Sequence, residues 1–372
     1  MEVTQKVLLA DYTTLRLGGP AGRFVTAGSE DELTGLVRAA DAEGEPALVL
    51  GGGSNLVVAD DGFPGTVVRI ASTGVRFAAA EDGVDVTVAA GEDWDSLVQR
   101  CIGEGLSGIE CLSGIPGLTG ATPIQNVGAY GQEVAQTILA VRVYDRLLDS
   151  ELQMTGAECD FGYRTSVFKR RALAGRGAGL NPAAATGRHV VLSVTFRLAA
   201  DPLSAPVRYG ELSRLLGAGD GGRVPLADAR AAVLQLRRGK GMVLDAADPD
   251  TRSAGSFFTN PVVPAAQLED VAARYAARSG GDAATAVPHW AEGDGMVKLS
   301  AAWLIEQAGF SKGYPGPAAG ARISTKHTLA LTSPGGGSTA DLVRLARQVR
   351  DGVLAAFGVR LTNEPALVGT EL

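Results

Sequence analysis

The sequence has few cysteines and no long apolar run. Its three cysteines, Cys101, Cys111 and Cys159, form no Cys-x-x-Cys pair, so neither a zinc site nor a disulfide framework is indicated. We expect no bound metal and a reducing compartment. A run of about 18 apolar residues, the length that a membrane span needs, is absent. The first residues also lack the basic start and apolar core of a signal peptide, so we expect a cytoplasmic protein without membrane insertion.

Positive charge is also scarce. The sequence has 34 Lys and Arg against 41 Asp and Glu, a net charge of −7, and no basic run long enough to form a stripe. This balance argues against nucleic-acid binding. Glycine, in contrast, is abundant, with 50 glycines in 372 residues, and its short runs beside apolar segments predict many tight turns and close backbone approaches. The length indicates two or three domains, and hence a multidomain enzyme is plausible.

Local patterns predict both helices and strands. Residues 29–32 form a capping box before a helical apolar stripe that is stopped by Gly44. Alternating apolar and polar residues at 84–88 and 192–198 predict half-buried strands, and a helix is expected around 94–102. The remaining predictions are a helix with a capping box at Ser338 and Asp341, whose apolar stripe belongs to the core, and a weakly ordered surface loop or insertion at 172–187.

Two glycine-rich segments are candidates for ligand binding. A buried strand at 46–50 runs into Gly-Gly-Gly-Ser-Asn at 51–55, where backbone N–H groups could approach phosphate oxygens closely. The Rossmann fingerprint fails because Leu56 stands where a third Gly or Ala is needed, and a plain turn at the strand end fits the same residues. Residues 115–131 are too glycine-rich for a helix interior and too apolar for a solvated linker. They fit either a buried ligand site or a compact irregular connection packed on itself.

Several motifs follow one another in a specific order. They are GGGSN at 51–55, IPGLTGATPIQNVGAYG at 115–131, FGYRTS at 161–166, YGEL at 209–212, AGSFFTNP at 254–261, KLSAAWLIE at 298–306 and NEP at 363–365. Together they resemble the UDP-N-acetylenolpyruvoylglucosamine reductase family over nearly the whole chain. The YGEL segment is similar to the gating loop of the longer branch of that family, in which a tyrosine closes over the substrate.

The resemblance implies an α+β flavoenzyme. Its FAD-binding region is of the vanillyl-alcohol-oxidase-like (PCMH) type in two parts, expected at 1–72 and 73–245, with 362–372 returning to the first part. A smaller α+β substrate-binding domain is expected at 246–361. The implied activity is NADPH-dependent reduction of UDP-N-acetylglucosamine enolpyruvate to UDP-N-acetylmuramate through FAD. This reaction belongs to peptidoglycan precursor synthesis, and so to cell-wall biogenesis, cell shape and cell division. The partners are then FAD, NADPH and a UDP-amino sugar, and we expect a monomer.

The resemblance also places the catalytic residues at Arg164, Ser256 and Glu364. Arg164 would bind and polarise the substrate carboxylate beside the negative charge that forms when hydride adds to the enol ether. Ser256 would deliver the proton that quenches this charge. Glu364 would stabilise the enolic intermediate as a hydrogen-bond donor, the least obvious of the three roles for a carboxyl group.

Binding residues are carried over in the same way. The implied FAD contacts are Gly51, Gly52, Gly53, Ser54, Asn55, Pro116, Gly117, Gly120, Thr122, Ile124, Gln125, Gly128 and Arg237. The implied substrate contacts are Tyr163, Tyr209, Lys240, Asn260, Trp290, Lys312 and His327. Trp290 and His327 depart from the family, which often has Tyr and Gln there, so we expect different contacts to the nucleotide or pyrophosphate at these points. From the sequence alone, His327 fits a surface histidine better than a substrate contact.

Two other functions share parts of this pattern. An FAD oxidase of the same fold would act on an alcohol or sugar, reduce oxygen and have no need of Ser256. A non-catalytic flavin-binding homologue would keep the cofactor site as a sensor or scaffold. Taken singly, Arg164, Ser256 and Glu364 each fit an ordinary surface, turn or strand-end role. Their occurrence together in family order favours the reductase.

Overall fold

The computed structural model describes residues 3–4, 7–174, 186–279 and 287–372. The chain divides into two compact units. The larger unit comprises 1–8, 20–53 and 62–243, and the smaller comprises 9–19, 54–61 and 244–372. Helices and strands mix in both, so the predicted α+β class is confirmed. Among the described residues, no helix combines the length and the apolar character needed to cross a membrane.

One sheet of the larger unit is mostly parallel. Its strand order is β1-β2-β5-β3, with the strands at Val3–Thr4 (β1), Ala21–Ala27 (β2), Phe63–Ile70 (β5) and Ala47–Leu50 (β3). β2, β5 and β3 are parallel, and β1 pairs antiparallel with β2. Parallel neighbours need a crossover, and helix α1 (Glu30–Ala42) provides it between β2 and β3. The predicted strand before the first glycine segment is β3.

Helix α1 begins and ends close to the predicted residues. The Ser29 side chain accepts a hydrogen bond from the Glu32 amide at 3.2 Å, and Gly44 follows the helix with φ 65°. The predicted capping box also requires the Glu32 side chain to accept from the Ser29 amide, and this half of the prediction is wrong. The Glu32 carboxylate accepts from the amide of Gly28 at 2.7 Å, because the side chain reaches one residue further back than the N-cap.

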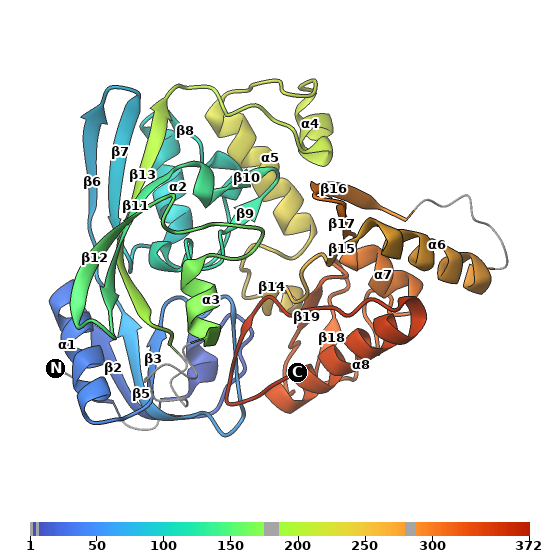
Figure 1. Ribbon diagram of the computed structural model, residues 1–372, viewed down its shortest axis with the longest axis horizontal. Coiled ribbons are helices and arrows are strands. Elements are labelled where there is room, and N and C mark those ends of the chain that lie inside the picture. The colour runs from blue at the N-terminus through green and yellow to red at the C-terminus, as the bar shows by residue number, and fades with distance from the viewer. Residues whose placement is uncertain (1–2, 5–6, 175–185, 280–286) are drawn as a thin grey trace. The chain divides into compact units, whose positions relative to one another are not determined.

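The second sheet of the larger unit is antiparallel, with its long strands side by side in the order β12-β11-β13-β7-β6, and β8 also pairs with β13 (Figure 1). The strands are Val75–Ala80 (β6), Gly83–Ala89 (β7), Leu106–Ser107 (β8), Ile138–Asp145 (β11), Ser150–Thr155 (β12) and His189–Ala200 (β13). Helix α2 (Trp94–Gly103), close to the predicted 94–102, packs into the same core. The half-buried prediction holds for 195–198. It is wrong for 192–194, where both faces of β13 are covered and even Ser193 is buried.

The larger unit also contains two short strands and three more helices among its described residues. These are β9 (Gly128–Ala129), β10 (Gln132–Glu133), α3 (Val167–Ala174), α4 (Gly210–Leu216) and α5 (Leu226–Gly239). The 3₁₀ turn Glu110–Leu112 packs with α4 and α5 through Cys111, Leu212 and Val233. Residues 172–174 of the predicted surface loop complete α3, and residues 175–185 of that loop lie outside the described residues.

In its described part, the smaller unit has three small sheets and three α-helices. The sheets are β14-β19-β18, β15-β17-β16 and the parallel pair β4 and β20. The strands are Leu56–Val58 (β4), Ser253–Ser256 (β14), Val262–Pro264 (β15), His289–Gly293 (β16), Met296–Leu299 (β17), Arg322–Ile323 (β18), Ala330–Thr332 (β19) and Ala366–Val368 (β20). The helices are Ala265–Ser279 (α6), Ala301–Gln307 (α7) and Thr339–Phe357 (α8).

Helix α8 confirms the prediction for the C-terminal region. Both halves of the capping box between Ser338 and Asp341 are formed, and Gly358 closes the helix with φ 71°. The Asp60 carboxylate adds bonds to the first amides of the helix, Thr339 at 2.7 Å and Ala340 at 2.9 Å. The apolar stripe of α8 belongs to the core of the smaller unit, as expected.

Candidate active site

The two predicted glycine segments meet in the larger unit. A Cβ atom on Gly52 would lie 2.7 Å from Cα of Gly117, closer than real Cβ contacts come. A Cβ on the neighbouring Gly51 would meet only the Leu118 side chain, at 3.8 Å. Only glycine permits this backbone approach at position 52. The backbone of the first segment therefore packs directly on the second segment.

The second glycine segment is held by the chain around α2. The amides of Thr119 and Gly120 donate to the carbonyls of Glu92 and Ala90, at 2.8 and 2.9 Å. A Cβ on Gly120 would lie 2.5 Å from that of Ala90, so glycine is again required for close packing. The hydroxyl of the buried Thr122 donates to the Thr119 carbonyl at 2.8 Å. The segment is thus ordered by neighbouring backbone, with Pro116 and Gly117 on its half-buried side.

Two charged groups lie beside this segment. Asp95 accepts from the Gly114 amide at 2.6 Å and forms a two-point pair with Arg230 at 2.7 and 2.8 Å. Burial of Asp95 opposes its ionisation, but the bonds from Arg230 and Gly114 outweigh burial and lower the pKa of the carboxyl.

Arg237, an implied FAD contact, projects from α5 close to Gly114. Burial lowers the pKa of its guanidinium to about 10. One terminal nitrogen donates to the Met242 carbonyl at 2.7 Å, whereas the buried Nε has no hydrogen-bond partner among the described residues. An unsatisfied buried donor is costly. The close approach of Gly52 to Gly117 and the unpaired Nε–H of Arg237 together fit a bound anionic cofactor.

Arg164 stands in a tight turn of the larger unit. Gly162 and Thr165 exchange backbone hydrogen bonds of 3.0 and 3.2 Å across it, and Arg164 has φ 52°. The guanidinium donates to the carbonyls of Gly128 at 2.6 Å and Asn126 at 3.2 Å. It also lies over the Tyr163 ring, 5.3 Å from the centroid. The predicted residues Gly128, Tyr163 and Arg164 are therefore brought together.

Sequence reasoning did not single out two residues beside Arg164. The buried Asn126 donates from its side chain to Glu133 at 2.8 Å and to the Gly162 carbonyl at 3.1 Å. Glu133 also faces Arg164, with 3.5 Å between Oε1 and a guanidinium nitrogen. The asparagine before Val-Gly-Ala-Tyr was visible in the motif, but only the long-range contacts give it a role.

The neighbours Ile124 and Gln125 lie at the edge of this region. Ile124 is exposed, and its carbonyl accepts from the Ser166 hydroxyl at 2.6 Å. The Gln125 side chain accepts from Lys169 at 3.4 Å. The same lysine donates to the Arg164 carbonyl at 3.4 Å. Lys169 was not predicted, and no local pattern marks it.

Tyr209 and Lys240 also lie together in the larger unit. Tyr209 precedes α4, and its ring meets the edge of the Tyr130 ring at 5.2 Å between centroids. Lys240 follows α5, pairs with Glu211 at 2.5 Å and lies 5.6 Å from the Tyr130 centroid. Burial raises the pKa of Tyr130 to about 12. Tyr130 and Glu211 were not predicted, although both stand inside quoted motifs.

Ser256 and Glu364 come together in the smaller unit. Ser256 ends β14 after Gly255, which has φ 73°. The next residue, Phe257, accepts a hydrogen bond at its carbonyl from the Glu364 amide at 2.9 Å. Both predicted catalytic side chains are half-buried. The long-range pairing of these two segments could not be deduced from local periodicity.

The end of the first glycine motif lies beside Glu364. Ser54 and Asn55 belong to the smaller unit. The Asn55 side chain donates to the Glu364 carbonyl at 3.5 Å, and its own carbonyl accepts from the Ala366 amide at 3.0 Å. These bonds begin the parallel pairing of β4 with β20.

The remaining predicted substrate residues lie at separate points of the smaller unit. The Asn260 side chain accepts from the Ala301 amide at 3.0 Å, at the start of α7. Trp290 is 51% exposed on β16, and Lys312 is exposed after α7. His327 is half-buried in the connection between β18 and β19.

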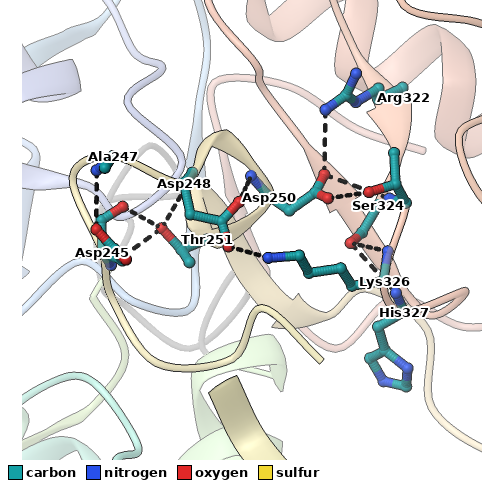
Figure 2. Close-up of polar contacts among 10 residues, drawn as sticks. Asp245, Ala247, Asp248, Asp250, Thr251, Arg322, Ser324, Lys326 and His327 are labelled. Atoms are coloured by element: carbon teal, nitrogen blue, oxygen red, sulfur yellow. Dashed lines mark hydrogen bonds and ion pairs between the residues drawn. The ribbon is translucent and has the colours of Figure 1, made fainter. Parts of the chain in front are cut away.

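A polar network fixes the connection that carries His327, as Figure 2 shows. The buried Asp250 accepts from Arg322 and from the Thr325 amide, each at 3.3 Å, and also from the Thr325 hydroxyl. Nearby, Lys326 pairs with Asp248 at 2.5 Å. The amides of Lys326 and His327 both donate to the Ser324 hydroxyl, at 3.0 and 3.2 Å.

The ring of His327 points away from these contacts (Figure 2). The network therefore holds the backbone of the connection and leaves the imidazole directed elsewhere. Because Ala330 pairs with Ser256, and the Leu329 carbonyl accepts from Phe257 at 2.7 Å, the same connection continues directly into the strand beside Ser256.

The predicted site residues thus form two groups. The larger unit holds Gly51, Gly52, Gly53, Pro116, Gly117, Gly120, Thr122, Ile124, Gln125, Gly128, Tyr163, Arg164, Tyr209, Arg237 and Lys240, and the smaller unit holds Ser54, Asn55, Ser256, Asn260, Trp290, Lys312, His327 and Glu364. Within the larger unit the two glycine segments meet and Arg164 packs on the second. Within the smaller unit the segments of Ser256, Asn55 and Glu364 are joined by backbone bonds.

Comparison with known proteins gives the same picture for the whole chain. Residues 21–147 match a family model described as "FAD binding domain", and residues 248–368 match "UDP-N-acetylenolpyruvoylglucosamine reductase, C-terminal domain". A protein of that enzyme name from Thermobifida fusca is 55% identical over 370 residues, which are 99% of this chain and 98% of the relative. One from Saccharopolyspora erythraea is 57% identical over 365 residues, 98% of this chain and 95% of the relative.

A solved structure is similar over its full length. The crystal structure of UDP-N-acetylenolpyruvylglucosamine reductase (MurB) from Thermus caldophilus has 27% sequence identity and a TM-score of 0.62, covering 99% of both chains. From the order of its motifs, the two matched domains and the identity to these relatives, the chain belongs to the UDP-N-acetylenolpyruvoylglucosamine reductase family.

Proposed function

We propose that this protein reduces UDP-N-acetylglucosamine enolpyruvate to UDP-N-acetylmuramate with FAD and NADPH, in peptidoglycan precursor synthesis. The observation that carries the proposal is the 55% identity to a reductase of that name over 99% of the chain. The structure adds that the predicted functional residues stand on ordered backbone in each unit. The reaction places the protein in the cytoplasm, where we propose that it acts as a monomer.

FAD, when bound, accepts hydride from NADPH and supplies it to the substrate. Its phosphates would lie against the glycine segments, where the contact between Gly52 and Gly117 excludes side chains. Arg237 offers a buried Nε–H that has no partner in the part of the chain that the structure describes. We assign 1–72 with 362–372 and 73–245 to the FAD-binding region, and 246–361 to the substrate. The cofactor residues are those that the resemblance implies: Gly51, Gly52, Gly53, Ser54, Asn55, Pro116, Gly117, Gly120, Thr122, Ile124, Gln125, Gly128 and Arg237.

In the reduction, the side chains of the protein stabilise the negative charge that forms on the substrate. Hydride addition to an enol ether leaves charge on the carbon next to the carboxylate, and that charge is the barrier. The planar fork of Arg164 suits a carboxylate, and its two bonds to backbone carbonyls hold it in one orientation. Preorganised charge of this kind can contribute several kcal/mol.

The other two catalytic residues that the resemblance implies, Ser256 and Glu364, belong to the smaller unit. Ser256 delivers the proton that completes the reduction, and Glu364 stabilises the intermediate as a hydrogen-bond donor. The bond between the Glu364 amide and the Phe257 carbonyl holds their two backbone segments next to each other. Tyr163, Tyr209, Lys240, Asn260, Trp290, Lys312 and His327 are proposed to contact the nucleotide sugar.

The decisive experiment separates the two half-reactions. In anaerobic stopped flow, Ser256→Ala should be bleached by NADPH at nearly the wild-type rate, yet be reoxidised by the enolpyruvyl ether slower by orders of magnitude, because only the second step needs the proton. Ser150→Ala, the same change on β12 of the larger unit, is the matched control and should reoxidise normally. Wild-type protein that is reoxidised by oxygen but not by the enolpyruvyl ether would instead identify an oxidase of this fold.

A further inference from the structure

The backbone at Arg164 is unusual for an arginine. The turn from Gly162 to Thr165 is closed by bonds in both directions, and Arg164 occupies its third position with φ 52°. In such turns this position favours glycine or asparagine, since the left-handed conformation is strained for larger residues. Strain of this kind persists only where surrounding structure enforces it. The contacts that enforce it here come from Asn126, Gly128 and Glu133.

The loop at 124–128 and the turn are bound to each other at three levels. At one edge the Ser166 hydroxyl donates to the Ile124 carbonyl at 2.6 Å. In the middle the Asn126 side chain donates to the Gly162 carbonyl at 3.1 Å. At the tip the Arg164 guanidinium donates back to the carbonyls of Asn126 and Gly128. The guanidinium position is therefore set by the position of the loop.

Asn126 is the centre of this arrangement. Its side chain is buried, and its backbone is also left-handed, with φ 50°. Both hydrogens of the amide nitrogen are engaged, one with Glu133 at 2.8 Å and one with Gly162 at 3.1 Å. The amide oxygen accepts from Ala135 at 3.1 Å. Only an asparagine has these donors and this acceptor at this length while tolerating the left-handed backbone.

The Glu133 carboxylate could either slow or support the reaction, depending on its role beside Arg164. One oxygen accepts from Asn126, and the other lies 3.5 Å from an Arg164 nitrogen. As a mere counter-charge, Glu133 would weaken the attraction of Arg164 for an anionic substrate, and removing it should help. As a support for the guanidinium, its removal should instead slow the reaction. The two roles predict opposite results.

We propose that Asn126 and Glu133 are positioning residues that hold the Arg164 guanidinium in its turn, in register for a carboxylate of the substrate. The inference rests on the proposed function for the identity of that carboxylate. It concerns the supports of Arg164, whose contacts to Asn126 and Gly128 are set within the larger unit. Misplacement of such a group by about 1 Å can cost on the order of 100-fold in rate.

The first test is Asn126→Asp, which keeps size and acceptor but removes both donors and adds a charge facing Glu133. Reoxidation of the reduced flavin by the enolpyruvyl ether should fall by about 100-fold, while bleaching by NADPH changes little. The matched control is Gln132→Glu. This variant makes the same amide-to-acid change beside another carboxylate, Glu110, at 2.9 Å. It should lose comparable thermal stability and keep its reoxidation rate.

The second test asks whether Asn126→Asp slows reoxidation by displacing the Arg164 guanidinium. In Arg164→Lys, adding Asn126→Asp should cost less than about threefold more, because a shared pathway makes the two losses non-additive. Glu133→Gln alone should slow reoxidation about tenfold, whereas faster reoxidation would leave Glu133 as a counter-charge only. Fully additive losses, or near-normal turnover of Asn126→Asp, would overturn the proposal.

A readout independent of turnover keeps the two proposals apart. Butanedione modification of Arg164, followed by peptide mass spectrometry, should be several-fold faster in Asn126→Asp than in wild type or Gln132→Glu, because the guanidinium is released from its carbonyl partners. If wild-type flavin fails to react with NADPH or the enolpyruvyl ether, the proposed function fails. The butanedione rates still decide the positioning role, and equal rates in all three proteins would refute it.

Discussion

Replacing Gly52 with alanine should disturb the contact between the two glycine segments. The added Cβ would lie 2.7 Å from Cα of Gly117 and 3.3 Å from its carbonyl carbon, and these are backbone atoms that no side-chain rotation can move. Ordinary contact begins at 3.4 Å, so the segments must separate by about 0.7 Å. Overpacking of this kind costs about 1–3 kcal/mol. If the cost falls on the cofactor-bound state, the Kd for FAD rises about 5- to 150-fold.

The assay needs two measurements and two controls. Urea unfolding of the FAD-free protein gives the loss of stability, and the FAD content after gel filtration gives the loss of binding. Gly51→Ala is the local control for stability, since its Cβ would meet the Leu118 side chain at 3.8 Å. Gly35→Ala, in α1 with nothing within 4 Å, is the control for FAD content. If Gly52→Ala matched both controls, the backbone contact would not be needed for folding or for the cofactor.

Two further changes follow from the charged networks. Asp250→Ala should cost about 3–5 kcal/mol because it leaves the half-buried Arg322 without its carboxylate partner. Asp248→Ala removes the pair with the more exposed Lys326 and the cap bond to the Asp250 amide, so it should cost less, about 1–2 kcal/mol. Similar urea midpoints for the two variants would contradict this ranking. The pKa of Asp95 is lowered in the folded protein, so its stabilisation is complete above the unfolded value of about 3.9 and is lost as pH falls through the folded value. Asp95→Asn should therefore have a lower free energy of unfolding than wild type at pH 7, and this free energy should fall less steeply below about pH 4. An unchanged slope in acid unfolding would argue against the pairing with Arg230.

Local chemistry in the sequence predicted much of the secondary structure. The stop of α1 at Gly44, the Trp94 helix and the capping box of α8 depend on residues a few positions apart, whose interactions are strong enough to set an element boundary. The burial of Ser193 was missed because alternation reports only one covered face. The Glu32 bond was misplaced because spacing alone does not fix which amide a flexible side chain reaches.

Long-range pairing was beyond local patterns. Nothing in the glycine runs says that Gly52 touches Gly117, or that the segments of Ser256 and Glu364 share a backbone bond. Such contacts depend on how sheets are connected, and only the resemblance to a family grouped these residues in advance. Asn126 escaped notice for a related reason, since its bonds to Glu133 and Gly162 join three segments of chain.

The composition of the smaller unit has a consequence for synthesis on the ribosome. Leu15, Leu17 and Val57 are buried with side chains from the last third of the chain, and β4 pairs with β20. The first of these partners, Ala254, follows β4 by about 200 residues and β20 follows it by about 300. At about 5–20 residues per second, the early side chains are therefore without these partners for on the order of 10–60 seconds. During that interval the nascent chain presents an apolar surface with no native cover. We therefore expect chains interrupted near residue 243 to be captured by chaperones, however well their first sheets have formed.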